Sequence, residues 1–374
     1  LGQYDPAMTD YMNEVMELYR HIFVTKNHWT FLIDGTSRSA IEAALVSMVE
    51  RGDKVLVPVF GRFGHLLTEI SERVGATVIP IHKDWGEIFT EEEIASALDQ
   101  HKPSILAICQ GDTSTTMNQP LDYVGRLCRE RGVISYVDAT ASLVGNPLPV
   151  DEYQIDICTV GLQKCLGGPS GSAPVTMTDE VADRIKRRWH VEKGIEPEGF
   201  KPGAGSRIQS NYFDLAMIMA YWSPDRLNHH TEATSMLYCA RECARCVLEE
   251  GLQNCLDRHF LASKAMVAGL KALGLDLYGN QDFKMTNVTG VYIPEGVISE
   301  AVRHDMLHDF GIEIGTSFGP LHGKIWRIGA MGYNARKDAI LRTLSSLTSV
   351  LKMHGVKLPD DDAALAALEV YRSA

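Results

Sequence analysis

The first hydrophobic positions of the chain have the spacing of an amphipathic helix. Asp5-Pro6 is typical of a helix N-cap followed by proline in the first turn. Apolar side chains then recur every three to four residues from Met8 to Phe23. We therefore predict a helix over this segment, and we interpret its Met and aromatic stripe as a packing face.

From residue 38 to about residue 177, short β-rich runs alternate with helix-like segments. The expected strands are Lys54–Val59, Thr77–Ile81, Ser104–Cys109, Val133–Val137, Ile155–Val160 and Ala173–Met177, and the expected helices are Ile41–Val49, Leu66–Val74, Glu91–Leu98 and Leu121–Arg131. Thr90 and Glu93 have the spacing of a capping box. The alternation predicts an α/β fold whose mostly parallel sheet carries helices on both faces. Ligands of such sheets bind beyond the carboxyl ends of the strands.

The rest of the chain has a different pattern. Residues 189–212 are polar and Gly-rich, and we expect a long surface loop of functional or mobile character. Helices are expected at about 229–250, 254–273, 299–310 and 336–353, with β runs at 288–293 and 325–328. We divide the chain into an N-terminal helical segment (1–25), a large α/β domain (26–250) and a smaller C-terminal α+β domain (251–374).

Composition excludes several classes of protein. The net charge of −12 over 374 residues disfavours nucleic acid or an anionic membrane as a partner. No apolar run approaches the roughly 18 residues of a membrane helix, and we expect no signal peptide and a cytoplasmic location. Cys243-x-x-Cys246 has no second pair at zinc-site spacing, so we interpret all eight cysteines as reduced and structural and expect no metal.

Two residues point to carbonyl chemistry with an electron-sink cofactor. Lys164 lies between a buried-looking β run and a Gly/Pro-rich turn, which suits a Schiff-base lysine with a lowered pKa. Asp138 ends another β run, where a carboxylate would keep a pyridine nitrogen protonated. A helix N-cap is the ordinary alternative for Asp138.

Two further segments suggest anion binding. Arg327 lies inside an apolar β run, where a guanidinium needs an anionic partner such as a substrate α-carboxylate. A structural ion pair remains the alternative. Residues 34–39 open a helix, and its free N–H groups would suit a phosphate, although a plain Ser/Thr N-cap has the same pattern.

Together these segments resemble the class V aminotransferases of fold type I, the alanine–glyoxylate aminotransferase group, over essentially the whole chain. More narrowly, the chain is similar to ureidoglycine aminotransferases of purine breakdown in the segments 2–6, 34–38, 59–64, 110–116, 163–168 and 227–231. The resemblance implies a large domain with a mostly parallel, seven-stranded-type sheet and a smaller α+β domain. It also implies pyridoxal 5'-phosphate as cofactor, ping-pong transfer from a small amino donor to an α-keto acid (glyoxylate, pyruvate or oxaloacetate), and a homodimer.

The resemblance implies a role for each matching residue. Lys164 would hold the cofactor and then move the proton, Asp138 would pair with the pyridine nitrogen, and Arg327 would hold the substrate carboxylate. The other cofactor contacts would come from Phe63 and Thr140 on the two ring faces, Thr113 at the ring hydroxyl, Thr36, Ser37, Arg38 and Gln163 at the phosphate, and Thr231 at the phosphate of the neighbouring subunit.

Two departures from the alanine–glyoxylate pattern concern the amino donor. This chain has Gln3 where those enzymes tend to have a small residue or histidine, and Asn228 where they have an aromatic residue. A primary amide offers donors and acceptors together, and a ureido group presents the complementary set. We therefore expect Gln3 and Asn228 to recognise the ureido group of (S)-ureidoglycine, because a site built to bond a polar group rejects analogues that lack it.

Other classes remain as alternatives. The nearest is an alanine or serine–glyoxylate aminotransferase. A cysteine desulfurase usually carries histidine before its lysine and a late catalytic cysteine, whereas here Gln163 precedes Lys164 and no cysteine follows Cys255. A nicotinamide oxidoreductase would need G-x-G-x-x-G at the first βα turn, which is missing. A binding module without activity is disfavoured because the lysine, aspartate and arginine positions are all filled.

Overall fold

The N-terminal segment forms the predicted helix. The computed structural model describes residues 1–2 and 4–374. Helix α1 (Pro6–Phe23) begins after Asp5, whose side chain accepts a hydrogen bond from the Ala7 N–H. Its apolar stripe is buried against the large sheet and α8, so the interpretation of this stripe as a packing face is confirmed.

The large sheet has seven strands in the order β1-β9-β8-β7-β4-β2-β3. The five strands from β8 to β3 form four parallel pairs, whereas β9 pairs antiparallel with both β8 and β1. The predicted mostly parallel sheet is therefore confirmed, with β9 as its reversed strand. The strands are β1 (Trp29–Gly35), β2 (Lys54–Val59), β3 (Thr77–His82), β4 (Ile105–Cys109), β7 (Ile134–Asp138), β8 (Ile157–Thr159) and β9 (Gly171–Met177).

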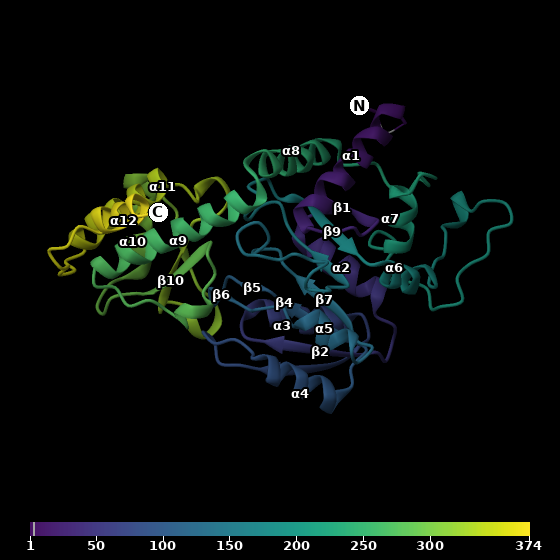
Figure 1. The fold of residues 1–374 in the computed structure, drawn as a ribbon, viewed down its shortest axis with the longest axis horizontal. Coiled ribbons are helices and arrows are strands. Elements are labelled where there is room, and N and C mark those ends of the chain that lie inside the picture. The colour runs from purple at the N-terminus through teal and green to yellow at the C-terminus, as the bar shows by residue number, and fades with distance from the viewer. Residues whose placement is uncertain (3) are drawn as a thin grey trace.

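Helices surround this sheet (Figure 1). They are α2 (Ser37–Met48), α3 (Arg62–Arg73), α4 (Glu91–His101), α5 (Val124–Arg129), α6 (Asp179–Lys186) and α7 (Leu215–Trp222). The central strand β4 is buried at all five residues, as expected of a parallel strand covered on both faces. The capping box at the start of α4 is present, with reciprocal hydrogen bonds between Thr90 and Glu93.

Several boundaries differ from the sequence prediction. The helix expected from residue 229 begins at Thr234 as α8 (Thr234–Glu250), because the preceding segment is bonded to β1 instead of to itself. Helix α5 begins at Val124, not at residue 121. The loop at 189–212 is irregular apart from one 3-10 turn at Lys193–Ile195, and Figure 1 shows it extending beside α6. Strand β1 and helices α6 and α7 were missing from the prediction.

The C-terminal part contains a second sheet and a second buried core. Helix α9 (Leu252–Ala272) leads to a three-stranded sheet in the order β10-β12-β11. The sheet and the helices beside it share a buried core that includes Trp326 of the sheet and Leu344 of a helix. In Figure 1 this part lies to one side of the large sheet. Its elements are β10 (Val288–Tyr292), α10 (Ser299–Phe310), β11 (Gly315–Thr316), β12 (Ile325–Gly329), α11 (Lys337–Met353) and α12 (Ala363–Arg372).

The connection between the two parts is short. Gly251, with φ of 91°, separates α8 from α9, so the proposed domain limit at 250/251 would fall in this turn. The three domain limits themselves stay a prediction. Among the helices of the described residues, none has both the length and the apolar character required to span a membrane.

Candidate active site

Asp138 lies at the carboxyl end of β7 as a buried carboxylate. Its side chain is 2% exposed, and Oδ1 accepts a hydrogen bond of 2.9 Å from the Thr140 N–H. No described lysine, arginine or histidine forms an ion pair with it. Burial raises the pKa of Asp138 above its usual range. Its charged form therefore needs stabilisation by a donor that the described cations do not provide.

Lys164 lies in the turn that follows β8, with its side chain half-buried. Burial, and then the charge of Arg327, lower the pKa of its ammonium group. Both effects disfavour the charged ammonium form, so a larger share of Lys164 is uncharged than for a lysine in water. An uncharged amine is the form that attacks a carbonyl carbon.

Arg327 on β12 brings a guanidinium from the C-terminal part towards the large sheet. Its Nε donates to the carbonyl oxygen of Thr316 at 2.7 Å and its Nη1 donates to that of Thr113 at 2.6 Å. The structural ion pair left open by the sequence is not formed with any described carboxylate. Burial lowers its pKa, which marks a cation without full compensation. Arg327 is thus held by backbone carbonyls and keeps donors for an anion.

The start of α2 lies against the segment that carries Lys164. Thr36 is the N-cap residue, but its hydroxyl makes no capping hydrogen bond. Ser37 Oγ accepts a hydrogen bond of 3.0 Å from Nε2 of Gln163. A Cβ at Gly161 would come within 2.6 Å of Gln163 Oε1, so glycine is needed for this approach. Arg38 is exposed beside the same helix start, where free N–H groups favour anions.

Phe63, in the first turn of α3, is held by a carboxylate that the sequence analysis missed. The fully buried Asp112 accepts hydrogen bonds from the Phe63 N–H and the Ser114 N–H, both at 2.9 Å, and from Ser114 Oγ at 2.6 Å. A Cβ at Gly61 would lie 2.3 Å from Asp112 Oδ2. The only signal in the sequence was the place of Asp112 in the 110–116 motif.

Two side-chain oxygens of this region have no hydrogen-bond partner among the described residues. Thr140 Oγ1 and Gln163 Oε1 are buried and make no hydrogen bond with the described residues. Buried polar atoms are rarely left in this state. Thr113 is buried as well, at 4% exposure, in the loop between β5 (Gly111–Asp112) and β6 (Met117–Asn118). The region is therefore suited to a ligand with polar groups of its own.

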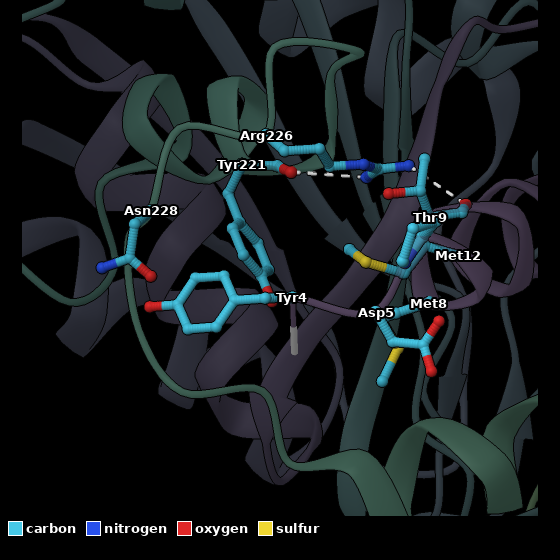
Figure 2. Close-up of a pocket in the computed structure, with 9 residues that line it drawn as sticks. Tyr4, Asp5, Met8, Thr9, Met12, Tyr221, Arg226 and Asn228 are labelled. Atoms are coloured by element: carbon cyan, nitrogen blue, oxygen red, sulfur yellow. Dashed lines mark hydrogen bonds between the residues drawn. The ribbon is translucent and has the colours of Figure 1, made fainter. Parts of the chain in front are cut away.

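The connection between α7 and α8, residues 223–233, carries two more of the predicted residues. Thr231 is exposed and lines an open pocket of about 590 Å³ together with Thr36 and Arg38. Asn228 is exposed and lines a separate cavity of about 210 Å³ with Tyr4 and Arg226 (Figure 2). Gln3 lies outside the described residues.

A cluster of three ionisable side chains fixes the end of this connection, and it was not predicted from the sequence. His230 Nε2 is 3.2 Å from Asp34 Oδ2 and 3.9 Å from Glu232 Oε2. The three ligand atoms lie within 4.8 Å of one another, a spacing that a metal ion could also use. The Ala233 N–H donates to Asp34 Oδ2 at 3.0 Å. Burial, and then the charge of Asp34, raise the pKa of Glu232 to about 7.

Comparisons with known proteins show the family to which the chain belongs. The model of the family described as Aminotransferase class-V matches residues 2–320. The (S)-ureidoglycine–glyoxylate transaminase of Bacillus subtilis (strain 168) is 50% identical over 376 residues, covering 100% of this chain and 90% of the relative. The alanine–glyoxylate aminotransferase of Felis catus is 33% identical over 356 residues, covering 94% and 82%.

A solved structure extends the similarity to three dimensions. The crystal structure of ureidoglycine-glyoxylate aminotransferase from Bacillus subtilis matches with a TM-score of 0.93 at 48% identity, covering 100% of this chain and 92% of that one. The family model spans more than half of the chain, and the two curated relatives cover nearly all of it. The chain is therefore an enzyme that belongs to the class-V aminotransferase family.

Proposed function

We propose that this enzyme uses pyridoxal 5'-phosphate to move the amino group of (S)-ureidoglycine to an α-keto acid. The observation that carries the cofactor assignment is the buried, cation-free Asp138 at the same sheet edge as the half-buried Lys164. The donor assignment rests on the 50% identity to the Bacillus subtilis transaminase named for ureidoglycine and glyoxylate. Glyoxylate is accordingly the first acceptor to test, with pyruvate and oxaloacetate as alternatives.

The residues present fit this cofactor. A protonated pyridine nitrogen would be a charged donor for the buried Asp138 carboxylate, which has no ion-pair partner among the described residues and accepts from the Thr140 N–H. Thr140 Oγ1 and Gln163 Oε1 are buried without hydrogen-bond partners among the described residues. A ring substituent would be a partner for the first, and a water-bridged or protonated phosphate for the second. Thr36, Ser37 and Arg38 at the start of α2 would hold the phosphate. Phe63 and Thr140 would flank the ring, and Thr113 would reach its hydroxyl.

The chain's own residues would then divide the chemistry. When bound, the cofactor supplies the electron sink that stabilises negative charge at the substrate Cα. Nζ of Lys164 would hold the cofactor, give way to the donor amine, and take the proton from the donor Cα. Asp138 would keep the pyridine nitrogen protonated. Arg327 would fix the substrate carboxylate so that the Cα–H bond faces Lys164. The same steps in reverse would load the amine onto the keto acid.

Donor selection would fall to the two amide side chains. Gln3 and Asn228 would bond the carbonyl and N–H groups of the ureido substituent, which alanine lacks. Thr231 is exposed at the surface of its own chain, and we propose that it reaches the phosphate of a second subunit. The active unit would then be a homodimer with its sites at the interface. The cytoplasmic location expected from the sequence stays a prediction.

Single-turnover spectroscopy tests the proposal. The purified protein should show the visible or near-ultraviolet absorbance of a lysine-bound cofactor. Freshly prepared ureidoglycine should remove this band much faster than alanine does. A band that responds to alanine or serine but not to ureidoglycine would leave an aminotransferase of the alanine–glyoxylate type. A protein that neither shows the band nor acquires it with added cofactor would contradict the cofactor assignment.

The role of the amides needs its own variants. Changing Gln3 and Asn228 together to alanine should lower ureidoglycine activity far more than alanine activity, because only the ureido donor loses its partners. Equal losses for the two donors would contradict the assignment of these residues.

A further inference from the structure

Arg226 ties the connection at residues 223–233 to the N-terminal helix. Its Nη2 donates to the Asn13 side chain at 2.8 Å and to the carbonyl oxygen of Thr9 at 3.3 Å, and its Nη1 donates to the carbonyl oxygen of Tyr221 at 3.3 Å. Figure 2 shows this guanidinium lying between the Tyr221 carbonyl group and Thr9. One side chain thus joins α1, the end of α7 and the connection itself.

The hydrogen bonds of the Arg226 guanidinium are typical of a side chain that holds segments in place, and not of an ion pair. Arg226 is half-buried, yet no described carboxylate lies within ion-pair distance of it, and its acceptors are all uncharged. Burial lowers its pKa, so the buried charge is a cost. A guanidinium offers several donors in a fixed plane, whereas an ammonium offers three donors from one point. Arginine is therefore the side chain that reaches acceptors on two separate helices at once.

The backbone at this point is also constrained. Arg226 has φ of 47°, in the left-handed region that few residues other than glycine adopt. Such a conformation persists where surrounding contacts hold it. Its three side-chain hydrogen bonds contribute to that hold, together with the backbone hydrogen bonds from the Arg226 N–H to Ser223 and from the Leu227 N–H to Ala220. The guanidinium therefore helps to set the direction in which the chain leaves Arg226.

The far end of the same connection has a second anchor. His230 and the Ala233 N–H both contact the Asp34 carboxylate at the end of β1. Between the two anchors, Asn228 and Thr231 are exposed. The connection is thus fixed at both ends, and the two exposed side chains lie on the segment between its anchors.

We propose that Arg226 is a positioning residue for recognition of the amino donor. By holding the connection on α1, it sets the place of Asn228, which lies two residues further along the chain and lines the same cavity of about 210 Å³ (Figure 2). Arg226 touches neither substrate nor cofactor in this role. The inference rests on the proposed function, since the residue it positions is the one assigned to the ureido group.

The experiment compares three variants as holoenzymes. Arg226→Met removes the hydrogen bonds but keeps the apolar bulk, and Arg226→Lys keeps the charge. Arg241→Met is the matched control, because Arg241 also ties α1 to another helix, through bonds of 2.9 and 2.6 Å to Glu14, but does not contact the connection. The readouts are kcat and KM for ureidoglycine and for alanine, and amide hydrogen exchange of residues 223–233.

The expected result is selective. Arg226→Met should lower kcat/KM for ureidoglycine about tenfold, which corresponds to the free energy of about one hydrogen bond. The kcat/KM for alanine should change less than about threefold. Arg226→Lys should recover part of the loss, and Arg241→Met should match the unchanged enzyme. In an Asn228→Ala background, Arg226→Met should add little, because Arg226 acts through Asn228. Exchange should rise in residues 223–233 only in the Arg226 variants.

Other outcomes separate this inference from the proposed function. Equal losses for both donors, or full additivity with Asn228→Ala, would overturn the positioning role while leaving the function intact. If the unchanged enzyme does not use ureidoglycine, the proposed amino donor is wrong. Amide hydrogen exchange then tests whether Arg226 positions the connection. Faster exchange in the Arg226 variants alone would then retain Arg226 as the residue that positions the connection, and unchanged exchange would overturn that role.

Discussion

Asp112 offers a direct test of how the site is built. Its two carboxylate oxygens serve different donors: Oδ2 accepts from the Phe63 N–H, and Oδ1 accepts from the N–H and the hydroxyl of Ser114. In Asp112→Asn, one oxygen becomes an NH₂ group and must face an N–H donor. One buried hydrogen bond is lost and its donor is left unpaired, so we expect a loss of about 3 kcal/mol in the free energy of unfolding.

The expected loss of stability in Asp112→Asn does not come from the loss of the carboxylate charge. Burial raises the pKa of Asp112, which means that its ionised form is already disfavoured in the folded protein. Neutralising the group should therefore cost little by itself. Asp156 provides the matched control, because burial raises its pKa too, but a single oxygen, Oδ2, accepts both bonds from Ser135 at 2.8 Å. Asp156→Asn can turn its carbonyl oxygen to both donors and should lose less than about 1 kcal/mol.

The assay is urea unfolding of the cofactor-free variants, followed by titration with pyridoxal 5'-phosphate. Asp112→Asn should also weaken cofactor binding, because Asp112 fixes the backbone of Phe63, whereas Asp156→Asn should bind normally. If the two variants unfold at the same urea concentration, the argument from hydrogen-bond geometry is refuted. If Asp112→Asn is less stable but binds the cofactor normally, the proposed ring contact of Phe63 is refuted.

Three further predictions concern charged groups. Lys164→Ala should abolish transamination and the visible band without changing the circular dichroism; residual turnover would contradict its role. Arg327→Lys should raise KM for both substrates about tenfold, because an ammonium does not bind carboxylate in bidentate fashion; unchanged KM values would exclude it from that site. Glu232, whose usual pKa is 4.5 and whose folded-state pKa is about 7, stabilises the fold below the lower value and loses this contribution as pH rises through the higher. Glu232→Gln should remove that part of the fall in the free energy of unfolding between about pH 4.5 and about pH 7, up to about 3 kcal/mol; an unaltered slope would contradict the assignment.

The positions of two candidate-site residues at one edge of the sheet were predictable because of how parallel sheets are built. Residues that follow successive parallel strands meet at one edge, so Asp138 after β7 and Lys164 after β8 could be placed together from local patterns alone. The capping box before α4 was also a local signal and is confirmed. Such features depend on residues a few positions apart, which the sequence displays directly.

Contacts between distant segments were not predictable in this way. Asp112 and Phe63 are 49 residues apart, and Ala233 and Asp34 are 199 apart. Strand β1 was missed because its identity depends on antiparallel pairing with β9 along its whole length. The segment before α8 looked helical, yet its polar groups bond to Asp34 instead, so tertiary contacts outweighed local propensity.

The three charged groups at the centre of the site share one physical property. Asp138 is buried and Lys164 and Arg327 are half-buried, none has an ion-pair partner among the described residues, and burial shifts the pKa of each towards its neutral form. Each pKa shift means that burial of the charged form destabilises the folded chain when no ligand is bound. A ligand with an acidic ring N–H, a carbonyl carbon and a carboxylate would relieve all three. Under the proposed function, the reason for these groups lies in the molecules that the site would bind, because their burial does not stabilise the fold.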